Sequence, residues 1–524
     1  MKLNYKVLLL TILVIPSLFL IIDTNFKIPE NSNAFTTENV KMASVVEWEN
    51  NGKAVCTAIE FQFYPKVCND GTGGAIITWI DSRGLDNDIY AQKVDSNGNM
   101  KWASNGIPIC TANLIQDSPQ IISDGSGGAI ITWQDDRNMD YDIYAQRVDS
   151  NGNMKWATNG IPICTATSYQ GSPQLISDGM GGAIITWHDN REIDTDTDIY
   201  AQRVDSNGNT LWFPNGTVIC TAEDTQFVSK IMSDGASGAI ITWSDMRTGS
   251  NSDIYIQRID ADGNVLWNPN GTAICTANYD QSNPQFCSDG TGGAIITWGD
   301  FRTNSNWDIY IQRIDSYGNI LWDPNGTIIC NLDSNQYHVR ICNDQVGGAI
   351  ITWFDDRDYY LVYSNLGVYA QRVDSNGNLM WASIGIPICN VWLGDAWAPE
   401  ICSDGTGGAI IAWLDVRASI TEWDIYVQRI NSNGNPIWAL NGTAVCTADE
   451  NQDHPALCED GTGGAFITWE DERSGTSKDI YVNMIKTEAE SRISFGSYFI
   501  TFTIISLFSL IIVIRRKSRV NTNL

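Results

Sequence analysis

Eight times along the chain, an aspartate and an arginine stand two positions apart, just after a tryptophan. An arginine fork can hold a carboxylate through two parallel hydrogen bonds, so each pair has the chemistry of a strong ion pair. One catalytic centre is enough for an enzyme, whereas these pairs occur in every one of eight similar units. We therefore predict structural ion pairs that set the contacts between units. They are Asp81 with Arg83, Asp135 with Arg137, Asp189 with Arg191, Asp245 with Arg247, Asp300 with Arg302, Asp355 with Arg357, Asp415 with Arg417, and Asp471 with Arg473.

Aromatic residues outside the repeated pattern indicate a different chemistry. Of the 20 tryptophans, four depart from the two fixed positions of the units, and all four fall in connecting segments of the fifth to seventh units, near three tyrosines. Aromatic side chains on loops held by a scaffold are typical of binding sites, where they stack on a sugar or anchor a protein. The alternative is that they cover the small core of a long loop. The candidate ligand-binding residues are Trp307, Tyr359, Tyr360, Tyr363, Trp392, Trp397 and Trp423.

Acidic residues near these aromatics leave an enzyme open as an alternative. A glycosidase needs two carboxylates in different environments within one pocket. No pair is singled out by its spacing, so we predict no catalytic residues and a protein that is not an enzyme. The three histidines lie at different places in different units and predict neither a zinc site nor a nucleophile triad. The acidic candidates are Asp355, Asp356, Asp358 and Asp395, and the histidines are His188, His338 and His454.

The turn Asp-Ser-Asn-Gly-Asn recurs with alternating oxygen-bearing side chains, as at the start of a calcium loop. The bidentate glutamate that closes such a loop is missing. A plain hairpin turn explains the pattern, because Asn-Gly accepts the positive φ that hairpins require. We expect no cofactor and no metal, with calcium as the alternative. The turn begins at Asp95, Asp149, Asp205 and Asp374, with variants at Asp260 and Asp315.

A repeat positions all of these residues. The segment Gly-Gly-Ala-Ile-Ile-Thr-Trp, or a close copy, occurs eight times at intervals of 54 to 60 residues. A fixed period of this size marks a repeat architecture. The unit at residues 118–166 contains a short apolar run bounded by turns, an Asp-Ile-Tyr run and an Asn-Gly turn before a further tryptophan, with no helical periodicity. Its fourth strand is expected to start at Met154 and to run on to Cys164. Four strands per unit predict the blade of a β-propeller.

The two ends of the array predict that the ring closes. The last unit lacks its fourth strand, and residues 45–58 form a fourth strand with no unit before them. If that strand completes the last blade, no sheet edge stays free. We predict one all-β, eight-bladed propeller of four-stranded blades over residues 44–486, and an open solenoid is the alternative. The 1–2 and 3–4 turns of the blades, on what we call the plain face, are nearly identical. The connections on the opposite, variable face differ.

The unit is similar to the Asp-box (BNR) repeats of sialidase-like propellers and of propeller proteins on prokaryotic cell surfaces. The likeness rests on Trp-x-Asp-x-Arg, the Asp-Ile-Tyr strand and the turn before tryptophan. The box is degenerate, because residues 151–156 read NGNMKW where the family has Asp-x-Gly-x-Thr-Trp. The resemblance implies a propeller fold. It implies no sialidase catalytic set, since no unit opens with Arg-Ile-Pro or carries a separate arginine-rich strand.

Both ends of the chain predict export and membrane attachment. Two lysines precede an apolar stretch, so residues 1–33 are a signal peptide or an N-terminal anchor. Residues 487–492 form a linker, 493–514 form an uncharged transmembrane helix, and the basic segment 515–524 is a cytoplasmic tail. This places the propeller outside the cell, with its variable face outward. The net charge of −29 argues against nucleic acid as a partner.

Two further patterns follow the repeat. Asn-Gly-Thr sequons begin at Asn215, Asn270, Asn325 and Asn441, and are either glycosylation sites or simply turns. Eight of the 13 cysteines share one position, and five more follow 12 or 13 residues later. Five disulfides can be drawn from them. Three of the first group have no partner, which favours small buried side chains instead.

These observations predict a membrane-anchored cell-surface protein that binds a glycan or an extracellular protein. A surface glycoside hydrolase or lyase of sialidase-like fold is the second hypothesis. A structural component of the cell envelope is the third.

Overall fold

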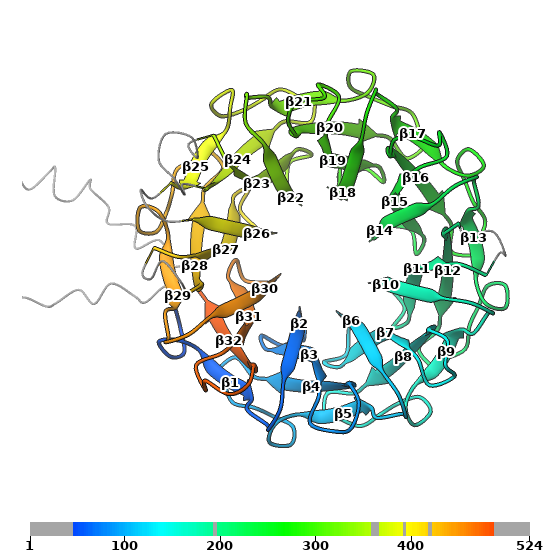
Figure 1. The fold of residues 1–524 in the computed structure, drawn as a ribbon, viewed down its shortest axis with the longest axis vertical. Coiled ribbons are helices and arrows are strands. Elements are labelled where there is room, and N and C mark those ends of the chain that lie inside the picture. The colour runs from blue at the N-terminus through cyan, green and yellow to red at the C-terminus, as the bar shows by residue number, and fades with distance from the viewer. Residues whose placement is uncertain (1–45, 192–195, 358–365, 391–394, 418–421, 487–524) are drawn as a thin grey trace, which may run out of the picture. The chain divides into compact units, whose positions relative to one another are not determined.

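The computed structural model describes residues 46–191, 196–357, 366–390, 395–417 and 422–486. These residues form 32 β-strands and no helix. The strands make eight four-stranded antiparallel sheets, which Figure 1 shows as blades around a central axis. The described part of the chain is therefore an all-β, eight-bladed propeller, as the repeat predicts. Blades 1 to 7 each use four consecutive strands from β2 to β29, and blade 8 uses β30, β31, β32 and β1.

Strands of equal rank in the eight blades share length and pattern. The innermost strands, nearest the axis in Figure 1, are β2 (Gln62–Asn69), β6 (Gln116–Ser123), β10 (Gln170–Ser177), β14 (Gln226–Ser233), β18 (Gln281–Ser288), β22 (Gln336–Asn343), β26 (Ala396–Ser403) and β30 (Gln452–Glu459). The second strands are β3 (Ala75–Asp81), β7 (Ala129–Asp135), β11 (Ala183–Asp189), β15 (Ala239–Asp245), β19 (Ala294–Asp300), β23 (Ala349–Asp355), β27 (Ala409–Asp415) and β31 (Ala465–Asp471).

The third and outer strands complete each blade. The third strands are β4 (Asp88–Val94), β8 (Asp142–Val148), β12 (Asp198–Val204), β16 (Asp253–Ile259), β20 (Asp308–Ile314), β24 (Gly367–Val373), β28 (Asp424–Ile430) and β32 (Asp479–Ile485). The outer strands are β5 (Ile107–Cys110), β9 (Ile161–Cys164), β13 (Thr217–Cys220), β17 (Thr272–Cys275), β21 (Thr327–Cys330), β25 (Ile386–Cys389), β29 (Thr443–Cys446) and β1 (Lys53–Cys56).

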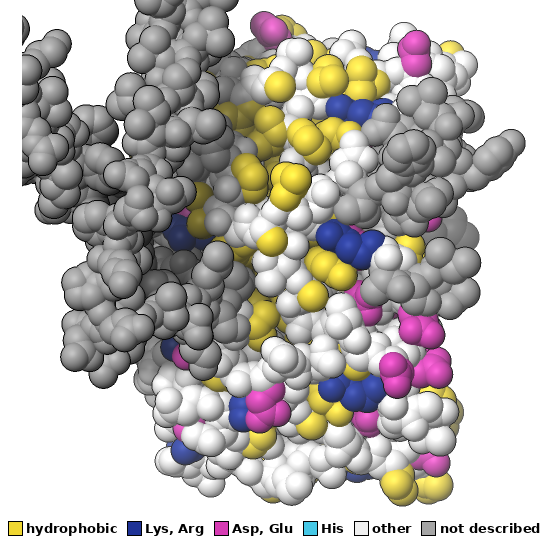
Figure 2. All heavy atoms as spheres, turned by 90° about the vertical axis from the view of Figure 1, so that its left-hand side faces the viewer, with side chains coloured by type: hydrophobic (Ala, Val, Ile, Leu, Met, Phe, Trp, Pro, Cys, Tyr) yellow, Lys and Arg dark blue, Asp and Glu magenta, His cyan; other side chains and the backbone are white. Residues whose placement is uncertain are grey.

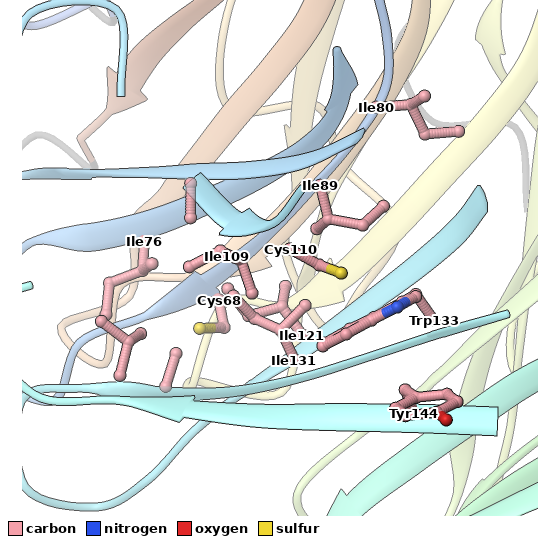
Figure 3. Close-up of a cluster of buried hydrophobic side chains, with 13 residues drawn as sticks. Cys68, Ile76, Ile80, Ile89, Ile109, Cys110, Ile121, Ile131, Trp133 and Tyr144 are labelled. Atoms are coloured by element: carbon pink, nitrogen blue, oxygen red, sulfur yellow. The ribbon is translucent and has the colours of Figure 1, made fainter. Parts of the chain in front are cut away.

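The core lies between the blades. Second strands such as β3 and β7 are buried along their whole length, because a neighbouring blade covers each face. This explains their continuous apolar run, which differs from the alternating pattern of a half-exposed strand. Figure 3 shows one such layer, where Ile76 and Ile109 of blade 1 meet Ile121, Ile131 and Trp133 of blade 2.

The N-terminal strand closes the ring, as predicted. β1 pairs antiparallel with β32, with Lys53 opposite Val482, and Val46 forms a bridge to Ile485. The innermost strand of blade 1 contacts blade 8 directly, so the array is not an open solenoid.

The fourth strand is shorter than the sequence suggests. We expected a strand from Met154 through to Cys164, but Met154 makes only a single bridge and β9 begins at Ile161. A turn intervenes, in which the Gly160 amide donates to the Ala157 carbonyl at 2.9 Å. Gly160 has φ 85°, and a Cβ there would lie 2.5 Å from the Trp133 ring. The turn therefore lets the backbone rest directly on the repeated tryptophan.

Each innermost strand carries a bulge near the variable face. The pairing register shifts by one residue in every blade, as between Tyr337 and Arg340 of β22. The third residue of each innermost strand has positive φ although it is not glycine. Those residues are Tyr64, Ser118, Ser172, Val228, Asn283, His338, Ala398 and His454. Bulges bend a strand and redirect its side chains.

No helix in the described ranges is long and apolar enough to cross a membrane. The predicted segments at residues 1–33, 487–492, 493–514 and 515–524 lie outside the described residues.

Candidate functional site

The repeated aspartates and arginines lie against each other in all eight blades. In blade 2, Arg137 Nε donates to Asp135 Oδ1 at 2.8 Å, and Nη2 donates to the Asn159 carbonyl at 2.8 Å. The Trp133 indole donates to the second carboxylate oxygen at 2.7 Å, and the guanidinium lies 3.8 Å from the centre of the Tyr144 ring. Every charged group in this clamp has a partner, so the clamp offers no free group for catalysis.

The asparagine of each outer turn links neighbouring blades. Asn159 of blade 2 accepts a hydrogen bond at its Oδ1 atom from the Thr111 amide, which follows β5 of blade 1. The sequence suggested only a turn or a glycosylation site here. The signal for this third role is the repetition of the asparagine in every unit except blade 6, where Ile384 replaces it. The four sequon asparagines accept the same bond: Asn215, Asn270, Asn325 and Asn441.

All 13 cysteines lie among the described residues, and none of them forms a disulfide. The outer-strand thiols lie beside the arginine of the next blade, as where Arg137 Nη2 approaches Cys110 Sγ at 3.2 Å. Burial raises the pKa of the Cys110 thiol to about 12. Thiols in this state are unreactive, so these cysteines act as small buried side chains that contact the clamp.

The recurrent Asp-Ser-Asn-Gly-Asn turn uses its own carboxylate. Asp149 Oδ1 accepts hydrogen bonds from the amides of Asn151 at 2.9 Å and Asn153 at 3.0 Å. Among the described residues, no group of three or more acidic, histidine or cysteine side chains is placed to hold a metal ion.

An aromatic hollow opens between blades 6 and 7 on the variable face. Its volume is about 450 Å³. The Phe354 and Trp397 rings stack with centroids 4.6 Å apart and an interplanar angle of 22°. Tyr337 stacks on Phe354 as well, with ring centroids 5.1 Å apart, and the His338 ring lies 5.5 Å from that of Trp397. The lining residues, which we call the aromatic hollow, are Tyr337, His338, Phe354, Asp356, Leu366 and Trp397.

Three strands build this hollow. Trp397 is the second residue of β26, and His338 is the bulge residue of β22 with φ 48°. Phe354 stands in β23 between the repeated tryptophan and the clamp aspartate, a position that differs in every blade. Trp397 is 37 % exposed, whereas Phe354 is 3 % exposed. Phe354 therefore supports the hollow from below, and Trp397 presents its surface to solvent.

A second hollow of about 250 Å³ adjoins the first. Tyr337 and His338 line both, and Trp307 lies in the wall of the second. Its remaining lining combines polar side chains, Ser282, Asn283 and Gln336, with Gly299, Ile309 and Val339. Two hollows that share two side chains form an elongated depression across blades 5 to 7, longer than a single small ring would need.

The structure brings two of the seven candidate aromatics into this depression, Trp397 and Trp307. Trp423 packs instead against the core cluster between blades 7 and 8, which fits the loop-core alternative for that residue. Tyr359, Tyr360, Tyr363 and Trp392 lie outside the described residues. Sequence reasoning missed Tyr337, His338 and Phe354. Alignment of the eight units at the variable position after the tryptophan shows Phe354 as the one phenylalanine, tyrosine or tryptophan there.

The acidic residues that were candidates for catalysis already have hydrogen-bond or ion-pair partners where the structure describes them. Asp355 is the clamp partner of Arg357. Asp356 lines the aromatic hollow, where its two oxygens accept from the backbone amide (2.6 Å) and side-chain amide (2.9 Å) of Asn335. Asp395 accepts from the Leu366 amide at 3.1 Å. Asp358 lies outside the described residues, so the described lining of the hollow contains one carboxylate and no second one to work with it.

His338 is a neutral wall of the hollow near pH 7. Burial, followed by repulsion from Arg340, lowers the pKa of His338 below its usual 6.5. A neutral imidazole can both stack and form hydrogen bonds without attracting anions.

A second apolar surface follows the outer rim. Figure 2 shows hydrophobic side chains gathered on the side of the ring that carries β25, β28 and β29. Independently of that view, the residue before the outer repeated tryptophan is apolar and 45 to 48 % exposed in blades 3 to 7: Leu211, Leu266, Leu321, Met380 and Ile437. The same position is charged in blades 8, 1 and 2, at Glu47, Lys101 and Lys155. The concave candidate site remains the depression on the variable face.

No family model and no curated protein matches the chain. Solved propellers are similar at low identity. A protein of unknown function from Dyadobacter fermentans aligns with 83 % of this chain and 98 % of its own, at 8 % identity and a TM-score of 0.36. An α-L-arabinanase from Penicillium chrysogenum, complexed with arabinobiose, aligns with 71 % of this chain and 93 % of its own, at 12 % identity and a TM-score of 0.35.

An α-L-arabinofuranosidase from Fusarium graminearum, in complex with an iminosugar inhibitor, aligns with 60 % of this chain and 92 % of its own, at 9 % identity and a TM-score of 0.34. At these scores the similarities assign neither an activity nor a substrate to this chain.

Proposed function

We propose that the chain is a membrane-anchored cell-surface protein that binds a glycan in the aromatic hollow and does not cleave it. The observation that carries the proposal is the stacked pair of Phe354 and Trp397 in the wall of a concave site. Its volume lies within the range of about 300 to 1,000 Å³ that small-molecule sites occupy. The membrane anchor rests on the sequence of the C-terminal segment alone.

The lining favours a sugar over other small ligands. A sugar ring has an apolar face of C–H groups and a rim of hydroxyls, so it needs an aromatic surface beside hydrogen-bonding groups. Trp397 offers the surface, and Asp356 keeps further acceptor capacity on each carboxylate oxygen. The adjoining hollow at Trp307 supports a chain of sugars rather than one ring.

The exposed position of Trp397 makes the proposal testable without unfolding the protein. We expect Trp397→Ala to weaken binding of the preferred oligosaccharide from a glycan array at least tenfold, about 1.4 kcal/mol. The matched control is Tyr317→Ala, which removes an aromatic that is 83 % exposed in a plain-face turn. Surface plasmon resonance on the full chain measures both. Equal affinities in the two variants would refute the site.

Trp307 tests the extent of the site. Trp307→Ala should weaken binding of longer oligosaccharides and leave the shortest ligand unaffected, because Trp307 lines only the second hollow. Release of shorter sugars from a bound oligosaccharide would instead support the glycoside hydrolase. Capture of a protein with no glycan bound on the array would favour a protein ligand.

A further inference from the structure

One position on the innermost strands forms a ring around the axis of the propeller. The fifth residue of each innermost strand pairs with the fourth residue of the second strand in every blade. These eight residues are therefore at the same depth along the axis. We call them the axial ring: Lys66, Gln120, Gln174, Lys230, Gln285, Arg340, Glu400 and Ala456.

The axial ring borders a hollow at the centre of the molecule. A hollow of about 180 Å³ is lined by residues of four blades, and Lys66, Gln120, Glu400 and Ala456 belong to the ring. Figure 1 shows the strands that carry them, β2, β6, β26 and β30, side by side around the axis. The ring is thus accessible to a small molecule.

The ring carries an excess of positive charge in a chain whose net charge is −29. Arg340 and Glu400 neutralise each other, with Nε and Nη2 of the arginine both 3.0 Å from the Oε1 atom. Lys66 and Lys230 remain. Within the described ranges, neither ammonium group has a hydrogen bond or an ion pair at contact distance.

Burial and the other charges of the ring shift the pKa values of the two lysines. Burial lowers the pKa of Lys66, with attraction from Glu400 opposing this effect and repulsion from Arg340 adding to it. Burial, followed by repulsion from Arg340 and Lys66, lowers the pKa of Lys230 to about 8. Charges from blades 1, 4 and 6 therefore converge on the axis. Desolvated cations without partners are costly, and a bound anion would offset that cost.

We propose that the axial ring binds a small oxyanion, a carboxylate or a phosphate group. Lys66 and the side-chain amide of Gln120 line the hollow, and Lys230 adds positive charge from the same depth of the ring. Glu400 limits the affinity, because it holds Arg340 and adds a negative charge at the edge of the hollow. The inference is independent of the glycan proposal, since it concerns the axis and not the aromatic hollow.

Calorimetric titration of the full chain tests the site, with sodium phosphate and sodium acetate as separate probes and sodium chloride at equal ionic strength as the reference. We expect saturable binding of phosphate, acetate or both, and no saturable binding of chloride. The double variant Lys66→Gln with Lys230→Gln should lose this binding. Glutamine removes two half-buried charges that have no ion-pair partner, so the variant should fold at least as well.

Two further variants sharpen the result. Lys101→Gln with Lys155→Gln removes the same charge from the exposed rim and should leave anion binding unchanged. Glu400→Gln should tighten binding several-fold, because it releases Arg340 and removes the only carboxylate of the ring. The proposal is overturned if neither probe binds saturably, or if the Lys66 and Lys230 double variant binds as tightly as the parent chain.

Discussion

Blades 6 and 8 use one backbone position for opposite purposes. The residue after the repeated tryptophan contacts the innermost strand of the next blade in both. In blade 6 it is Phe354, which stacks on Trp397 and supports an open hollow. In blade 8 it is Glu470, whose oxygens lie 2.8 Å from Lys478 Nζ and 2.8 Å from the Tyr64 amide.

The bulge residues repeat the contrast. His338 and His454 occupy the same position of β22 and β30 with φ 48° and 49°. His338 belongs to the aromatic wall, whereas His454 Nδ1 lies 3.2 Å from Glu470 Oε1. The scaffold therefore fixes the backbone and allows the side chain at this position to vary from blade to blade. An apolar ring there leaves a depression for a ligand, and a carboxylate fills the same space with ion pairs.

The largest effect is expected from Phe354→Ala. Phe354 is 3 % exposed and stacks on two aromatic rings, so truncation should cost about 3 kcal/mol of unfolding free energy, at the lower end for buried phenylalanine because the hollow is open. Chemical denaturation measures this loss, and glycan binding should fall with it. Trp397→Ala should lower binding with much less loss of stability. A Phe354→Ala chain as stable as the parent would contradict the supporting role.

Glu470→Gln should destabilise the protein without affecting the hollow. Loss of the charge leaves His454 with only Asp453 at 3.4 Å and Lys478 with only Glu472 as an acidic neighbour. We expect a cost of about 2 kcal/mol, since both side chains can still reach water. Glu472→Gln is the matched control, because Glu472 is more exposed and lies 3.6 Å from Lys478 Nζ. The control should change stability by less than about 0.5 kcal/mol. A loss of glycan binding in Glu470→Gln would contradict the assignment of separate roles to this position in blades 6 and 8.

The third strands of the two blades differ in their response to pH. Blade 8 begins this strand with Asp479, and burial, followed by repulsion from Asp471, raises the pKa of Asp479 to about 6. Blade 6 has Gly367 there. The contribution of Asp479 to stability is full below its usual pKa of 3.8 and is lost as pH rises through about 6. Asp479→Asn should therefore raise the thermal midpoint at pH 8 relative to the parent, and the gain should shrink toward pH 4.

Four other third-strand aspartates have raised pKa values near 6 or 7, and their contributions to stability should also be lost as pH rises through those values: Asp88, Asp253, Asp308 and Asp424. Calorimetry of the parent chain should show a midpoint that falls between pH 5 and pH 8. A flat profile would exclude buried carboxyls as the cause.

The smallest effects are expected from the protonation of two histidines, His338 and His454. The hydrogen bond to Glu470 raises the pKa of His454 above 6.5, whereas burial lowers the pKa of His338. His454 adds stability below pH 6.5 that is lost as pH rises through its raised pKa. His338 has the opposite sign and loses its contribution as pH falls through its lowered pKa. Nuclear magnetic resonance titration should place the two on opposite sides of 6.5, and Glu470→Gln should lower only the value of His454.

Much of the fold was predictable because the repeat encodes it redundantly. Each blade repeats the apolar second strand and the glycine turn, and seven of the eight repeat the Asp-Ile-Tyr strand, which reads Gly-Val-Tyr in blade 6. A misleading residue in one copy is therefore outweighed by the other copies. The closure by β1 followed from the strand missing after Ile485. The error at residues 155–160 arose because the turn there depends on Gly160 resting against Trp133, a contact between segments that spacing alone does not reveal.

The site was only partly predictable. Trp307 and Trp397 departed from the repeat and were visible as exceptions. Phe354 and His338 stand at regular positions, and their role depends on the bulge that brings β22 toward β26. Lys66 and Lys230 lie far apart in sequence among glutamines at equivalent positions. They lie at the same depth along the axis because every blade repeats the same backbone. Residues that are one or more blade lengths apart in the sequence therefore take equivalent positions around the ring.

Because the ring closes through blade 8, both ends of the described chain leave it at one place. Val46 and Ile485 form a bridge, the Glu47 amide donates to the Met484 carbonyl at 2.9 Å, and Lys486 Nζ lies 2.8 Å from Glu47. The chain thus enters and leaves the ring side by side at the plain face. The aromatic hollow lies at the opposite ends of the strands. Attachment through either end, by a lipid-embedded segment or by a tag on a sensor surface, would therefore act at the same edge of the plain face, at the opposite ends of the strands from the hollow.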